Sequence, residues 1–193
     1  MRLIGLLMLL MLCLPGSLHA EELNAFDLKV KGWAEACRDE ITAQFELLLT
    51  AGKLTVPQLF DTFYIPIPNS SPQKFHTQYD QMTDGVLRPI IDKYLEKDKR
   101  LVFVVPVDVN GYLPTHNSRY SRPLTDDPDE NTKWNRTKRI FNDRTGLAAA
   151  HNQEPFLLQR YSRDTGEIMS DLSVPIIVQN RHWGAVRIGY RQK

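Results

Sequence analysis

The sequence has very little cysteine and almost no net charge. Only two cysteines, Cys13 and Cys37, occur in 193 residues, which is too few for the disulfide framework of a small secreted domain. Lys and Arg number 24, and Asp and Glu number 23. Because binding to nucleic acid needs an excess of positive charge on the protein, we expect no nucleic acid among the main partners.

Motifs of catalysis and of metal binding are also missing. The sequence has no glycine-rich phosphate loop, no Gly-x-Ser-x-Gly nucleophile motif and no pair of histidines four residues apart. The acidic run DDPDE at 126–130 lacks the spacing and the central glycine of a calcium loop. These absences favour a protein that is not an enzyme and that holds no metal or other cofactor.

A long hydrophobic run occurs near the N-terminus. Arg2 precedes the apolar residues 3–14, and small residues end the segment at Ala20. This order indicates a secretory signal peptide over residues 1–20, and the run is shorter than the ~20 residues of a membrane span. We expect cleavage after Ala20 and a periplasmic location, with an uncleaved signal anchor as the alternative. The remaining residues, 21–193, have the length of a single domain.

The first part of this domain is predicted to be helical. Apolar residues recur every three or four positions from Leu23 to Leu49, which predicts one long amphipathic helix that ends near Gly52. Cys37 falls on the apolar stripe, so we expect a buried thiol, with a reactive thiol or an intermolecular disulfide as the alternative. A proline-rich extended stretch follows, and then a second helix over 76–94.

The second part is predicted to form strands. A β-branched run at 101–116 surrounds Asn110-Gly111, a strong hairpin signal. A second hairpin is predicted over 155–178, and a last strand over 182–190. Together these segments predict five antiparallel strands, grouped as two and three.

Residues 117–154 separate the two groups of strands and are too many for a plain loop. We predict helices at 132–143 and 147–150 within this insert. Two strands, a helical crossover and three strands behind a long helix is the chain order of a PAS-like fold. The predicted fold class is therefore α+β, with a five-stranded antiparallel sheet, a long N-terminal helix and a helical crossover.

Four segments of the chain have distinctive motifs: GYLPTHN (111–117), NRTKRIFNDRTGL (135–147), PFLLQRYSRD (155–164) and RHWGAVRIGYR (181–191), with LFDTFYIPIPNSSPQKFHTQYD (59–80) upstream. In this order they resemble the Cache/PAS-like sensory domain of bacterial methyl-accepting chemotaxis proteins. The resemblance implies a sensor of a small polar ligand, such as an amino acid, organic acid, amine or purine, bound between the sheet and the connecting helices and loops. It also implies chemotaxis-type signal transduction, here by a stand-alone exported protein acting through a membrane-bound partner.

Two other functions stay open at this point. Sensor domains often dimerise through their first helix, so a homodimer, or a dimerisation module without a ligand, is one alternative. A haem-binding periplasmic protein that uses His116 or His151 is the other.

The predicted helix 132–143 carries charged candidates for the binding site. Arg136, Arg139 and Asp143 are spaced by three and four residues and would share one face of this helix. Arg139 and Asp143 could pair directly, and the planar donors of arginine suit a ligand carboxylate. The alternative is an ion pair that only stabilises the fold.

Polar candidates also occur at the ends of the predicted strands. His116, Asn117 and Tyr120 follow the second strand, where the chain leaves the sheet, and Tyr161 lies on the third. For His116 and Asn117 the alternative is that they cap a turn. The predicted ligand site therefore comprises His116, Asn117, Tyr120, Arg136, Arg139, Asp143 and Tyr161.

Overall fold

The computed structural model describes residues 22–162 and 168–192. The signal peptide predicted for residues 1–20 lies outside the described residues and stays a prediction. In the part of the chain that is described, no helix is long and apolar enough to cross a membrane.

A four-stranded antiparallel sheet forms the centre of the fold, in the order β3-β8-β7-β6. The first strand of the chain to enter this sheet thus pairs with the last. The tight turn between β7 and β8 places Gln179 and Asn180 at φ 51° and 58°, as in the turns that match the twist of paired strands. The strands are β3 (Leu101–Asp108), β6 (Leu157–Ser162), β7 (Ile168–Val178) and β8 (Arg181–Arg191).

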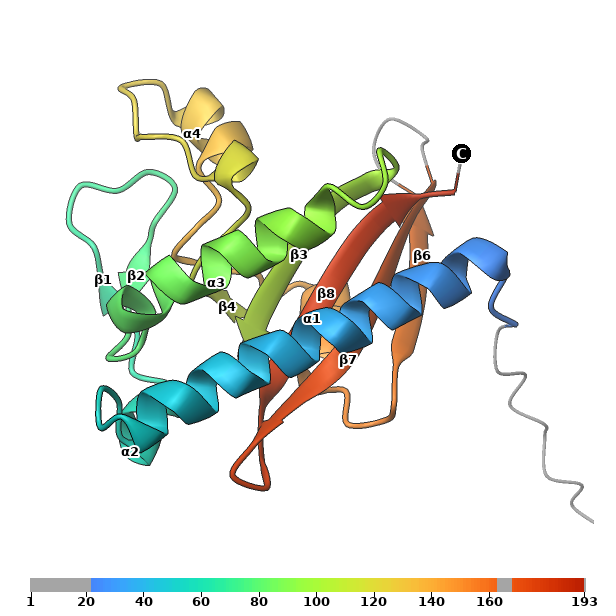
Figure 1. The fold of residues 1–193 in the computed structure, drawn as a ribbon. Helices are drawn as coiled ribbons and strands as arrows, with labels where there is room; N and C mark the ends of the chain where they lie inside the picture. Colours follow the sequence, from blue (N-terminus) through green and yellow to red (C-terminus); the bar gives the residue numbers. More distant parts are fainter. Residues whose placement is uncertain (1–21, 163–167, 193) are drawn as a thin grey trace, which may run out of the picture.

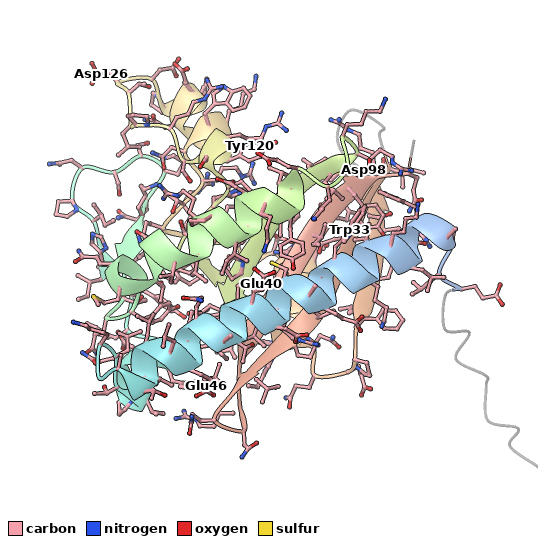
Figure 2. The ribbon with its side chains drawn as sticks, in the orientation of Figure 1. Trp33, Glu40, Glu46, Asp98, Tyr120 and Asp126 are labelled. Atoms are coloured by element: carbon pink, nitrogen blue, oxygen red, sulfur yellow. The ribbon has the colours of Figure 1, made fainter. Side chains whose placement is uncertain are left out.

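Two helices, α1 (Ala25–Thr50) and α3 (Asp80–Leu95), lie across one face of the sheet (Figure 1). Asn24 caps α1 by accepting hydrogen bonds from two backbone N–H groups of its first turn. Glu40 lies between the two helices (Figure 2) and accepts a hydrogen bond from the Tyr94 hydroxyl at 2.7 Å. Helices α1 and α3 confirm the helices predicted over 23–49 and 76–94. The buried apolar residues of α1 are Phe26, Val30, Ala34, Cys37, Ile41 and Phe45.

The prediction of a five-stranded sheet was wrong in the number of strands, since the central sheet has four. The chain after the Asn110-Gly111 turn forms only a short strand, β4 (Tyr112–Leu113), which pairs with β5 (Arg139–Ile140) in a separate two-stranded ladder. Pro114 follows β4 at once, and because proline has no backbone N–H it cannot extend a ladder.

The proline-rich segment before α3 also forms short elements. These are the single-turn helix α2 (Val56–Leu59) and a ladder between β1 (Ile65–Pro66) and β2 (Phe75–His76).

The predicted helix 132–143 was wrong. The structure has a short helix α4 (Pro128–Trp134), then β5, and then a separate helix α5 (Arg144–His151). Asp143 does not end a helix but begins one, since its Oδ1 accepts the backbone N–H groups of Thr145 and Gly146 at 3.0 and 3.1 Å. Aspartate is preferred at this capping position, and the capping preference outweighs the helical spacing of the neighbouring arginines.

Helix α5 packs against the second face of the sheet, opposite α1 and α3, whereas the β4–β5 ladder adjoins β3 and places Tyr112 and Ile140 in the core beneath those two helices. The segment after β5 packs closely against the β3–β4 turn and α5, because two glycines flank the carbonyl of Phe141. A Cβ at Gly111 or at Gly146 would lie 2.4 or 2.2 Å from that oxygen, so a larger residue at either position would push the segment away. The apolar contact on this face is formed by Val105, Val107, Leu113, Ala150 and Ala185.

Candidate functional site

A cavity of about 350 Å³ lies on this second face of the sheet. Side chains alternate along a strand, so β3 turns Phe103 and Val105 toward the cavity while Val104 joins the core beneath α1 and α3. The sheet also contributes Tyr161 from β6 and Arg187 from β8. The remaining walls of this inner cavity come from Leu113, His116, Arg136, Phe141, Asp143 and Thr145.

An outer hollow of about 310 Å³ adjoins the inner cavity. Four residues line both spaces, so the two form one cleft with these residues at the junction. The outer hollow is lined by the stacked rings of Tyr120 and Trp134, whose centroids are 5.9 Å apart at an interplanar angle of 17°. Tyr120 lies next to α4 (Figure 2). The four junction residues are Phe103, His116, Arg136 and Tyr161.

The structure brings together five residues of the site predicted from the sequence. His116, Arg136 and Tyr161 are junction residues, Asp143 lines the inner cavity and Tyr120 lines the outer hollow. These residues come from separate parts of the chain and meet only because the insert folds back over the sheet.

Asn117 does not line the cleft. It is fully buried, its Oδ1 accepts the backbone N–H of Val104 at 2.9 Å, and its Nδ2 donates to Asp92 of α3 at 3.2 Å. Asn117 therefore ties the short 3₁₀ helix η1 (Ser118–Tyr120) to the sheet and to α3.

Arg139 also lies outside the cleft. Its Nη1 donates to the carbonyl of Thr132 at 3.3 Å, and its guanidinium lies 5.1 Å from the centre of the Phe141 ring. Arg139 and Asp143 form no ion pair in the described chain, because they belong to β5 and to the cap of α5 and not to one helix.

His116 is a buried, neutral hydrogen-bond donor. Its Nδ1 accepts the backbone N–H of Asn117 at 2.8 Å, so the proton of the neutral ring lies on Nε2. Burial lowers the pKa of His116 well below its ordinary value, and the charges of Arg136 and Arg139 lower it further. A protonated Nε2 has no lone pair for a metal, which disfavours haem binding through this atom.

Among the described residues, no three His, Cys, Asp or Glu side chains are placed to hold one ion.

Arg187 and Asp171 were not predicted as site residues. The guanidinium of Arg187 donates from Nη2 to Asp171 Oδ2 at 2.5 Å and from Nε to Oδ1 at 3.5 Å. Burial opposes the charge on Arg187, but Asp171 outweighs it and raises the pKa of Arg187 above its ordinary value. The sequence did hold a signal, since Asp171 and Arg187 are charged residues in the interior of mostly apolar strand segments.

Comparisons with known proteins give no family assignment. No protein-family model matches the sequence, and no curated protein matches it.

Several solved structures are similar at a low level. An extracellular ligand-binding receptor from Desulfohalobium retbaense is 13% identical with a TM-score of 0.38, over 88% of this chain and 26% of that one. A C-terminal domain from Streptococcus mutans is 9% identical with a TM-score of 0.30, over 69% of this chain and 95% of that one.

The ligand-binding domain of the Pseudomonas aeruginosa amino-acid chemoreceptor PctC, in complex with GABA, is 12% identical with a TM-score of 0.27. That match covers 87% of this chain and 65% of the other. This chain thus spans about a quarter of the receptor from Desulfohalobium retbaense. TM-scores below 0.5 establish neither a shared fold nor a shared function.

Proposed function

We propose that the protein reversibly binds a small polar molecule in the cleft, outside the cytoplasm, and passes its ligand state to a membrane-bound signalling partner. The observation that carries this proposal is the inner cavity itself. Its volume of about 350 Å³ falls in the range of about 300–1,000 Å³ found for small-molecule sites. Its walls combine aromatic and aliphatic side chains with a few polar groups that converge on one space, as such sites usually do.

A route from the cleft to the helices supports the sensory part of the proposal. His116 and Tyr120 face the cleft, and Ser118 between them donates from its backbone N–H to Asp92 of α3 at 2.9 Å. A ligand that moves this segment would therefore act directly on α3, which packs against α1. Export and the membrane partner follow from the predicted signal peptide and from the resemblance to chemoreceptor domains.

Dimerisation through α1 belongs to the same proposal, because sensor domains of the resembling family often pair through their first helix. The outer side of α1 carries Leu28 and Leu47, which are 56% and 59% exposed. Light scattering of the protein with and without ligand would test this part, and a monomer under both conditions would exclude it.

A thermal-shift screen with a cavity-filling variant tests ligand binding. The compounds are amino acids, organic acids, amines and purines. Thr145 lines the inner cavity at the start of α5, so Thr145→Trp fills it; Ala148 is exposed on the same helix, so Ala148→Trp is the matched control. We expect at least one class to raise the Tm of the wild type and of Ala148→Trp but not of Thr145→Trp. No shift with any class, or an equal shift in Thr145→Trp, would contradict the proposal.

The membrane partner is tested separately. Solubilised membranes of the source cells are passed over immobilised protein with and without the compound found in the screen. We expect one integral membrane protein to be retained in amounts that depend on the compound. Retention that ignores the compound would argue against transfer of the ligand state.

A further inference from the structure

Positively charged side chains line the outer hollow of the cleft. Among the described residues, Lys133, Arg136 and Arg191 line the outer hollow, and no Asp or Glu does. In the inner cavity the charge of Arg187 is matched by Asp171, and Asp143 already accepts two backbone N–H groups at the start of α5. The positive potential of Arg136 and Arg139 also reaches the junction, since both charges oppose protonation of His116.

The junction presents a donor without an acceptor beside it. His116 is 3% exposed, and its Nδ1 is engaged by the backbone of Asn117, which leaves the proton on Nε2. Within the described chain Nε2 has no hydrogen-bond partner, while the ring lines both parts of the cleft. An N–H group at this place pairs with a ligand oxygen and repels an ammonium or amidinium N–H.

The walls suit a flat ring. Phe103, Phe141 and Tyr161 surround the inner cavity. The ring of Phe103 lies directly over Gly189, where an added Cβ would come within 2.2 Å of it. Glycine at position 189 therefore lets this ring lie closer to the sheet than a larger residue there would permit. Aromatic walls of this kind bind planar rings by stacking and edge-to-face contact.

We propose that the ligand is an aromatic carboxylate, with its ring in the inner cavity and its carboxylate at the junction, where it accepts hydrogen bonds from His116 Nε2–H and from the guanidinium of Arg136. This inference rests on the proposed function and narrows it to one ligand class. A carboxylate uses both the neutral donor and the surrounding positive charge, whereas a neutral amide or an amidinium does not.

Three probes of nearly equal shape and different charge test the inference. Benzoate is an anion, benzamide is neutral and benzamidine is a cation, and their affinities for the full chain can be measured by ligand-observed NMR at millimolar concentrations. We expect benzoate to bind at least about tenfold more tightly than benzamide, a difference typical of one charge-assisted contact. Benzamidine should show no measurable binding.

Variants of His116 separate the donor from the ring. Glutamine can place an N–H group near the position of Nε2, so His116→Gln should keep benzoate affinity within about threefold, whereas His116→Phe should lower it about tenfold or more. Arg136→Gln should remove the preference for benzoate over benzamide. Arg144→Gln is the matched control, because Arg144 is exposed at the start of α5 and lines neither part of the cleft, and it should keep this preference.

The outcomes distinguish the inference from the proposed function. Equal or tighter binding of benzamide or benzamidine overturns the inference and leaves the proposed function standing. The same holds if none of the three probes binds while another compound in the thermal-shift screen does. If His116→Phe binds benzoate as the wild type does, the junction is not the carboxylate site and the inference fails. If no compound of any kind binds, both fail.

Discussion

The guanidinium of Arg187 and the carboxylate of Asp171 face each other across strands β8 and β7, with Arg187 7% exposed and Asp171 fully buried. The pair lies on the sheet face that carries the cleft, and Arg187 forms part of the floor of the inner cavity. Its position is therefore fixed by a second side chain and not by the ligand. The pair thus holds this guanidinium in the cavity floor through contacts within the protein.

Breaking this pair should destabilise the domain strongly. Arg187→Leu leaves the Asp171 carboxylate buried without a partner, and we expect the free energy of unfolding to fall by about 3–5 kcal/mol. The double variant Arg187→Leu/Asp171→Leu should recover most of this loss, because it removes both charges. Urea unfolding measures both effects. Equal destabilisation by the single and double variants would contradict this explanation.

Asp143 should stabilise α5 as its cap and not as an ion-pair partner of Arg139. We expect Asp143→Ala to lower the free energy of unfolding by about 0.5–2 kcal/mol and Asp143→Asn to preserve most of it, because asparagine also caps helices. A double-mutant cycle between Arg139→Ala and Asp143→Ala should give a coupling near zero. A coupling of about 1 kcal/mol or more would show that the two side chains interact after all.

The thiol of Cys37 should be inert in the folded protein. Cys37 is fully buried against the sheet, and burial raises the pKa of its thiol far above the usual range, with Glu40 adding to the effect. Since the thiolate is the reactive form, alkylation by iodoacetamide should be slow in buffer and fast at a denaturing concentration of guanidinium chloride. Mass spectrometry of the Cys37 peptide measures both rates. Fast alkylation without denaturant would contradict the packing of α1.

Lys74 should make stability depend on alkaline pH. Its ammonium is buried among uncharged acceptors, the Thr137 carbonyl and the Asn135 side chain. Burial, together with the nearby charges of Arg139 and Lys138, lowers the pKa of Lys74 from 10.5 to about 8. The unfolded chain therefore holds this proton more tightly between these two values, and the free energy of unfolding should rise as pH increases through that window.

The control for this pH dependence is the variant Lys74→Met, which removes the buried charge and keeps a side chain of similar length. Urea unfolding of both proteins at several values from pH 7 to 10 isolates the contribution of this one group. The rise should be present in the wild type and absent from Lys74→Met. Parallel pH profiles would show that Lys74 keeps its ordinary pKa in the fold.

The sequence predicted those elements whose pattern repeats over many residues. The long helix followed from apolar residues at helical spacing, and the strands of the main sheet followed from β-branched runs and turn signals. Both patterns reflect burial on one face, which is a property of the segment itself. Five residues of the cleft were predicted because polar side chains at strand ends and in long connections often line sites.

The insert was harder to predict because short segments carry competing signals. Arg136, Arg139 and Asp143 have helical spacing, but Asn135 and Asp143 favour helix ends, and the choice between these readings depends on Pro114 and on the close contact at Gly111 and Gly146. Arg187 and Asp171 could not be assigned to the site, since only the register of β7 against β8 brings them together. Such cross-strand contacts depend on pairing between distant parts of the chain.

Binding of a small molecule in the cleft on the second face of the sheet can be observed in a crystal structure of the protein grown with the compound that raises its Tm most. We expect density for that compound between His116, Tyr161 and Thr145, with polar atoms within hydrogen-bond distance of His116 Nε2 or the guanidinium of Arg136. Density for the compound elsewhere on the protein, with the cleft closed by its own side chains, would contradict this expectation.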